Sequence, residues 1–160
     1  MDKALDQKFK DLLSRLQKEL LKQKGFKKNG SNFRQFLPDG TCKIINFQKS
    51  MFNGDGEYRF TINIGLYFQQ DMESIYSNFK EYECQIQTRV AGISQRYVGD
   101  YWWVLTETTE VEKLYAELLT LMQEDILPWL DQFSCRRDAI RAGQAGKLKN
   151  MIRGSIYVNI

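Results

Sequence analysis

The sequence predicts an α+β fold, an antiparallel meander sheet of about five strands with two long helices packed on one face. Apolar and polar residues alternate without interruption over 58–68, which is typical of a half-buried strand. Apolar residues recur at spacings of three and four over 5–20 and again over 111–122, which indicates two amphipathic helices. Among the 160 residues, 42% are hydrophobic and 27% are charged, so the chain can bury a core of ordinary size.

The first helix is expected over 5–20, where leucines and Phe9 form one apolar stripe. Gly25 is expected to end it, because glycine readily adopts the left-handed conformation that closes a helix C-terminus. A loop that begins at Gly25 then runs into a short strand at about 33–37, and residues 38–40 form a turn.

The central hairpin joins strands at 42–51 and 58–68 through turn residues at 53–57. The residues expected on the core face of its first strand are Ile45, Phe47 and Met51. A short helix is then expected over 71–79, followed by strands at 82–90 and 101–106. The residues expected on the core face of the strand at 82–90 are Cys84, Ile86 and Val90.

The second long helix begins with a capping box, in which Thr109 and Glu112 satisfy each other's free backbone N–H groups. Pro128 is expected to end or kink this helix, because proline lacks an N–H donor and clashes with the preceding turn. A last helix is expected over 134–142, with the Ser134 side chain as its cap.

The domain organisation expected from these elements is a single α+β domain over 1–142 and a C-terminal tail over 143–160. Within the tail, apolar residues alternate over 155–160. An alternating segment of this kind is expected to add a strand to a sheet edge, in the same chain or in a second copy.

The composition excludes several classes of chemistry. The chain contains no histidine, which rules out Ser-His-Asp and Cys-His nucleophiles and histidine-ligated zinc. Its three cysteines lie far apart and are expected to be reduced thiols. No catalytic motif, metal-binding set or cofactor motif is recognisable, so the analysis of residues favours a non-enzymatic protein. No apolar run is long enough to cross a membrane or serve as a signal peptide, and a cytoplasmic location is expected.

Several short motifs follow one another in a characteristic order. They are GF at 25–26, NF at 32–33, FQKS at 47–50, FTINIG at 60–65, CxIxxR at 84–89, WW at 102–103 and LP at 127–128. In this order they resemble the bacterial domain of unknown function 4304 family, over residues 5–133. The resemblance implies a compact α+β fold in small bacterial proteins without an established activity, and it brings no catalytic residues to this chain.

The sheet face that the helices leave open is the first candidate for a site. By strand parity this second face carries amides and arginines, with one tryptophan of the adjacent pair turned toward it. Such groups orient a partner or a ligand, whereas a merely solvated face more often carries lysine and glutamate. The candidate partner- or ligand-binding residues are Gln48, Asn63, Arg89, Trp102 and Trp103.

Three functions remain open from the sequence. We favour a binding module that acts on another bacterial protein, of the immunity or regulatory kind, as a monomer or a homodimer. The first alternative is a domain that binds a small molecule or nucleotide, with or without carboxylate catalysis. The second alternative is weak nucleic-acid binding by the basic loop residues Lys27, Lys28 and Arg34, although a net charge of +3 gives it little support.

Overall fold

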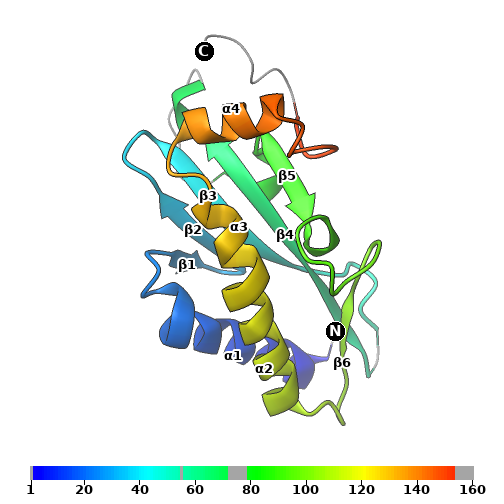
Figure 1. Ribbon diagram of the computed structural model, residues 1–160. Coiled ribbons are helices and arrows are strands. Elements are labelled where there is room, and N and C mark those ends of the chain that lie inside the picture. The colour runs from blue at the N-terminus through cyan, green and yellow to red at the C-terminus, as the bar shows by residue number, and fades with distance from the viewer. Residues whose placement is uncertain (1, 55, 72–78, 154–160) are drawn as a thin grey trace.

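The computed structural model describes residues 2–54, 56–71 and 79–153, and within them the chain forms one six-stranded antiparallel sheet. The strands are β1 (Lys27–Asn29), β2 (Asn32–Phe36), β3 (Thr41–Lys49), β4 (Tyr58–Phe68), β5 (Ile86–Arg89) and β6 (Trp103–Leu105). They follow the order β1-β2-β3-β4-β5, and β6 pairs with β4 as well (Figure 1). Two long helical segments cover one face of this sheet, which confirms the predicted fold class.

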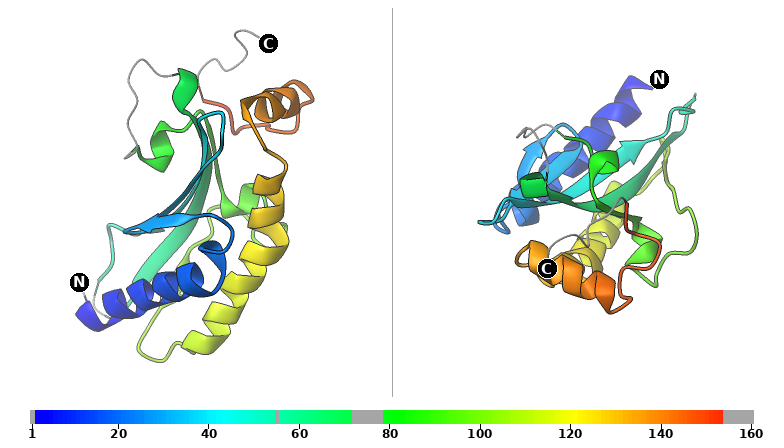
Figure 2. Two further views of the ribbon diagram at one scale, coloured as in Figure 1. Left: turned by 90° about the vertical axis from the view of Figure 1, so that its left-hand side faces the viewer. Right: turned by 90° about the horizontal axis from the view of Figure 1, so that it is seen from above.

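In the described part of the chain, the helical segments form two long rods and one short helix. The first rod joins α1 (Lys3–Leu16) to the π-turn η1 (Gln17–Leu21), and the second joins α2 (Val111–Leu121), the π-turn η5 (Met122–Ile126) and α3 (Leu127–Asp131). The short helix is α4 (Arg136–Gln144), and single 3-10 turns are η2 (Gln69–Asp71), η3 (Glu81–Glu83) and η4 (Val90–Gly92). Both rods lie on the same side of the sheet, and η3 lies on the other side (Figure 2).

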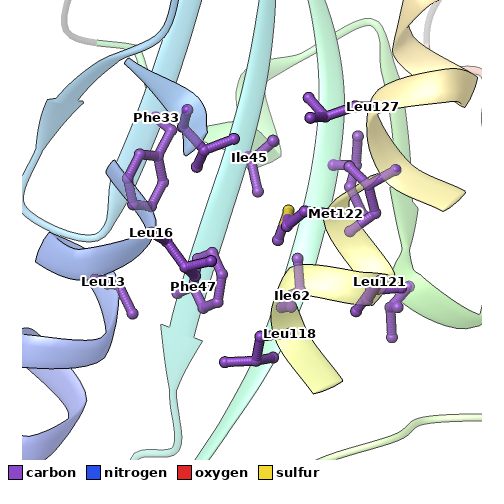
Figure 3. Close-up of a cluster of buried hydrophobic side chains, with 14 of the residues drawn as sticks. Leu13, Leu16, Phe33, Ile45, Phe47, Ile62, Leu118, Leu121, Met122 and Leu127 are labelled. Carbon is purple, nitrogen blue, oxygen red and sulfur yellow. The ribbon is translucent and has the colours of Figure 1, made fainter. Parts of the chain in front are cut away.

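The main core lies between the rods and the sheet because the apolar stripes of both rods meet the even-numbered residues of β4. Leu16 from α1, Phe60 and Ile62 from β4, and Met122 from the second rod are all fully buried in one cluster. Figure 3 shows Leu16, Ile62 and Met122 converging there. At about 1.5 to 3 kcal/mol for each fully buried apolar side chain, this cluster dominates the stability of the fold.

The N-terminal rod ends as predicted, but the segment that follows is not a loop. Gly25 has a φ of 90°, and the helix is replaced by turns immediately before it. Residues 27–29 then form β1, which pairs with β2 around Gly30, whose φ is 60°. The Asn29-Gly30 pair is a hairpin signal that the sequence analysis assigned to a loop.

Met51 does not lie on the core face, so that prediction was wrong. Strand β3 ends at Lys49, and the alternation of faces cannot be extended past the end of a strand. Met51 and its neighbour Phe52 are each 89% exposed at the tip of the hairpin.

Pro128 does not end the second rod. The π-turn η5 comes directly before it, with the N–H of Leu127 at the C-cap donating to the carbonyl of Met122. Pro128 then stands in the first turn of α3, the part of a helix in which proline is best tolerated. The wide π-turn therefore lets the rod continue to Asp131.

Two predicted helix caps were also wrong. Thr109 precedes the N-cap Glu110, and its hydroxyl accepts a hydrogen bond from the N–H of Thr106 instead of capping α2. At the start of α4 the N-cap is Cys135, and the N–H of Ser134 donates to the Asp138 carboxylate. In both cases the N-cap position lies one residue further along the chain than predicted.

The chain after α4 returns to the sheet. Leu148 and Met151 are buried in the main core, and Ile152 forms an antiparallel bridge with Ile86 of β5. The helix expected over 71–79 falls mainly, and the strand expected over 155–160 entirely, outside the described residues. None of the helices that the structure describes is long and apolar enough to cross a membrane.

Candidate functional site

The second face of the sheet divides into a covered part and an open part. The covered part is a small apolar cluster of Cys42, Ile44, Tyr67, Phe79 and Cys84, which we call the second cluster. The Tyr67 ring stacks on Phe79 with 3.9 Å between ring centroids and 9° between planes. The segment around η3 therefore folds over this end of the sheet. The second face was expected to be polar throughout, but this end of it is apolar.

Cys84 does not face the core with Ile86 and Val90, and that prediction was wrong. It follows the 3-10 turn η3 rather than standing in a strand, so strand parity does not apply to it. Its side chain lies over Gly65, where an added Cβ would come within 2.8 Å of the Cys84 sulfur. The absence of a side chain at Gly65 is what lets the chain cross β4 at this point.

The buried thiols of the second cluster, Cys42 and Cys84, are unreactive near neutral pH. Burial raises the pKa of Cys42 to about 12 and raises the pKa of Cys84 well above its ordinary value, because a thiolate loses its hydration there. The thiolate is the nucleophile and the metal ligand, so neither residue serves as one near neutral pH. Within the described part of the chain, no group of three or more cysteines and acids could hold a metal ion.

A thiol titration should separate the cysteines by exposure. All three are free, but Cys135 is partly exposed while Cys42 and Cys84 are buried. We expect a maleimide reagent to label one thiol per chain rapidly in the folded protein and all three after unfolding, counted by mass spectrometry. Rapid labelling of two or three thiols under native conditions would show that the segment around Cys84 does not stay on the sheet.

The open part of the second face carries a chain of side-chain amides, which we call the amide ladder. The Asn63 Nδ2 donates to Gln48 Oε1 at 2.8 Å and to Asn46 Oδ1 at 3.1 Å. The Asn46 Nδ2 in turn donates to Asn32 Oδ1 at 2.8 Å. The ladder crosses β2, β3 and β4 because Asn32, Asn46 and Asn63 are directly paired in the sheet register. These neighbours hold each amide in one orientation.

Three of the predicted site residues border one open cleft of about 510 Å³. Gln48 and Asn63 come from the ladder, and Arg89 is the register partner of Asn63 on β5. The Arg89 guanidinium pairs with Asp100 and lies 5.5 Å from the Trp102 ring centroid. The remaining residues around the cleft are Ile64, Glu81, Tyr82, Gln87, Thr88 and Arg153.

The two tryptophans point to opposite faces, although Trp102 comes directly before β6 and only Trp103 lies within it. Trp103 is 3% exposed in the main core, stacks on Phe60 and donates from Nε1 to Glu117 at 3.2 Å. Trp102 is half-buried on the second face and borders a second hollow, of about 340 Å³, together with Phe52 and Arg59. Of the two predicted residues, only Trp102 can belong to a site on this face.

The predicted basic residues lie at the other end of the sheet. Lys27, Lys28 and Arg34 all line a pocket of about 310 Å³ beside β1 and β2. Arg34 is only 6% exposed, whereas binding to nucleic acid would need its guanidinium to be accessible together with the cations of the basic loop. The structure thus brings the three residues together, but around a pocket rather than along a surface.

Phe52, Tyr82 and Arg153 border the open part of the face and were not predicted as site residues. Phe52 comes directly before the expected turn residues 53–57, and its exposure follows from the position of the turn. Arg153 reaches the cleft only because its N–H donates to the Gln85 carbonyl, which folds the end of the chain against β5. No local pattern in the sequence signals such a long-range contact.

The family of the chain follows from its match to a protein family model. The family model described as a domain of unknown function (DUF4304) matches residues 17–132. The chain belongs to the DUF4304 family. The matched part of this DUF4304 chain contains all six strands and both π-turns, and it ends before α4. No curated protein and no solved structure matches the chain.

Proposed function

We propose that this DUF4304 protein is a non-enzymatic binding module that recognises another protein, of the immunity or regulatory kind. The contact surface is the open part of the second face, which we call the amide face. It consists of Gln48, Phe52, Arg59, Asn63, Arg89 and Trp102. The observation that carries the proposal is that exposed aromatic and arginine side chains flank a fixed set of amides. Aromatic residues, methionine and arginine are enriched in protein interfaces.

The ladder fixes which amide atoms face the cleft. Asn63 uses its Nδ2 group in two bonds inside the ladder, so its Oδ1 is left to accept. Gln48 uses its Oε1 to accept from Asn63, so its Nε2 is left to donate. One acceptor beside one donor matches a peptide group or a side-chain amide of a partner.

Arg89 is held in place before any partner binds. The Asp100 carboxylate and the Trp102 ring fix its guanidinium from two sides, while the side chain remains partly exposed. A pre-positioned arginine loses less conformational entropy on binding than a free one. Further out, Phe52 and Met51 offer apolar surface at the hairpin tip. The face therefore has an ordered polar centre and an apolar margin.

The proposal is tested by photo-crosslinking in the native host and then by affinity. A photoreactive amino acid at position 52 should crosslink to one defined protein, and the same amino acid at Gln123 should not. Gln123 is an exposed position on the rod that covers the opposite sheet face. Equal crosslinking patterns at the two positions would reject the amide face as the contact surface.

For the crosslinked protein, Arg89→Ala should weaken binding by about 1 to 3 kcal/mol with little change in melting temperature. The matched control is Arg96→Ala, because Arg96 is also an exposed, ion-paired arginine but pairs with Glu124 and Asp125. It should bind normally. Unchanged affinity of the Arg89 variant would place the binding energy elsewhere.

A further inference from the structure

The pocket beside β1 and β2 contains a buried cation with little compensation. Arg34 is 6% exposed, and its side chain is a guanidinium with donors only. None of the ion pairs formed within residues 2–54, 56–71 and 79–153 includes Arg34. Its Nη2 donates to the carbonyl of Phe79, and its Nε has no hydrogen-bond partner in the described chain. Burying a charge without a counter-charge is costly, so this arrangement requires an explanation.

A second cation stands directly opposite the first. Lys27 and Arg34 are paired in the antiparallel register of β1 and β2, so their side chains leave the same face of the sheet. Like charges in this position repel each other, because their Cβ atoms are about 5 Å apart. Lys28 borders the same pocket, and none of the described residues that line it is acidic. An oxyanion bound between the Lys27 and Arg34 side chains would attract both cations and offset their mutual repulsion.

The pocket also has an apolar wall. Phe36 lines it, is 45% exposed, and makes an edge-to-face contact with Phe79 at 6.2 Å between ring centroids. The Arg34 guanidinium lies 5.0 Å from the Phe79 ring centroid, so the cation is supported from one side by an aromatic ring. A flat apolar group can therefore pack on Phe36 while its charged end meets Lys27 and Arg34.

We propose that this pocket binds a small molecule with an oxyanion group, a phosphate monoester or a carboxylate, attached to a flat apolar body. The site is separate from the amide face and does not depend on its function. A nucleic-acid strand fits less well, because strand binding uses a row of exposed cations along a groove. Here the basic groups converge on one pocket of about 310 Å³, and Arg34 is buried in its wall.

The test uses phenyl phosphate and benzoate as probes, titrated into the full chain by calorimetry at constant ionic strength. At least one probe should bind at millimolar concentration or below and raise the melting temperature, and the tighter of the two identifies the preferred oxyanion. Lys27→Met should weaken binding roughly tenfold, as expected for a lost hydrogen bond to a charged group. Lys24→Met is the control, because Lys24 is exposed nearby without lining the pocket. It should bind normally.

Arg34→Met separates a ligand-binding role from a structural one. Replacing an uncompensated buried charge by an apolar side chain often leaves a fold equally stable or more stable. The variant should therefore keep or raise its melting temperature without probe while losing probe binding. If the Arg34 variant is unfolded, the guanidinium stabilises the fold and its charge is compensated there. The probe affinity of Lys27→Met alone then tests the binding proposal.

The proposal fails if neither probe binds, or if Lys27→Met binds both as well as the wild type. It also fails if a single-stranded oligonucleotide binds more tightly than the probes and is weakened equally by Lys24→Met and Lys27→Met. That result would indicate diffuse nucleic-acid binding.

Discussion

Leu16→Asp is expected to unfold the protein at room temperature. Leu16 is completely buried in the main core, on the side of α1 that meets β3. A carboxylate there would either stay charged without a partner or bind a proton, and both cost several kcal/mol on top of the lost apolar contacts. The free energy of unfolding of a domain of this size is about 5 to 15 kcal/mol, so one such change removes most of it.

The measurement is far-ultraviolet circular dichroism with thermal melting. Ser14→Asp is the control, since Ser14 lies two residues earlier on the exposed side of the same helix. It should change the free energy of unfolding by about 0.5 kcal/mol or less. A cooperative melt of the Leu16 variant near that of the wild type would mean that α1 does not belong to the core.

Tyr67→Ala is expected to lower the free energy of unfolding by about 3 kcal/mol, the range for truncation of a buried aromatic side chain. Tyr67 is 0% exposed, and it loses its stacking on Phe79 when truncated. The result tests the second cluster directly, because on an open polar face the same substitution would have almost no effect. Chemical denaturation measures the change.

Arg59→Ala on the same strand and the same face is the comparison. Arg59 is exposed and, among the described residues, forms its ion pair with the exposed Glu57, an interaction worth about 0 to 1 kcal/mol. The two variants should therefore differ by about 2 kcal/mol or more. Equal stabilities would show that the segment around Phe79 does not cover the sheet.

The periodicity of the sequence predicted β2 to β6 and the main core, but not β1, whose three residues are too few to show an alternation. In β4 the even-numbered apolar residues all face the helices, as the alternation required. The same parity correctly placed Asn63 and Gln48 together opposite the helices, where the ladder bond joins them. It also required one tryptophan of the pair to turn outward, and the structure identifies Trp102. The inference on the amides depends on a period of two within unbroken strands, whereas Trp102 faces outward from a position just before β6.

The errors occurred where a strand stops or where distant segments meet. Cys84 was assigned by continuing the alternation of β5 backward past its first residue, Ile86, to the residue that caps the 3-10 turn η3. Tyr67 was placed on the correct face, but its burial depends on Phe79, twelve positions away in the sequence. Arg34 was grouped with the basic loop residues although the strand expected over 33–37 contains it, and nothing near it in the sequence shows that this strand lies beside Phe79.

The π-turn in the second rod keeps both ends of that rod facing the sheet. An α-helix rotates by about 100° per residue, so in an unbroken α-helix Leu130 would point about 120° away from Leu118. Both leucines are buried in the main core, because the π-turn takes up one residue more than an α-turn does. Deleting the exposed Gln123 from the π-turn should therefore leave a regular helix that still packs on the sheet, whereas inserting a residue after Ile126 should turn Leu130 away from it.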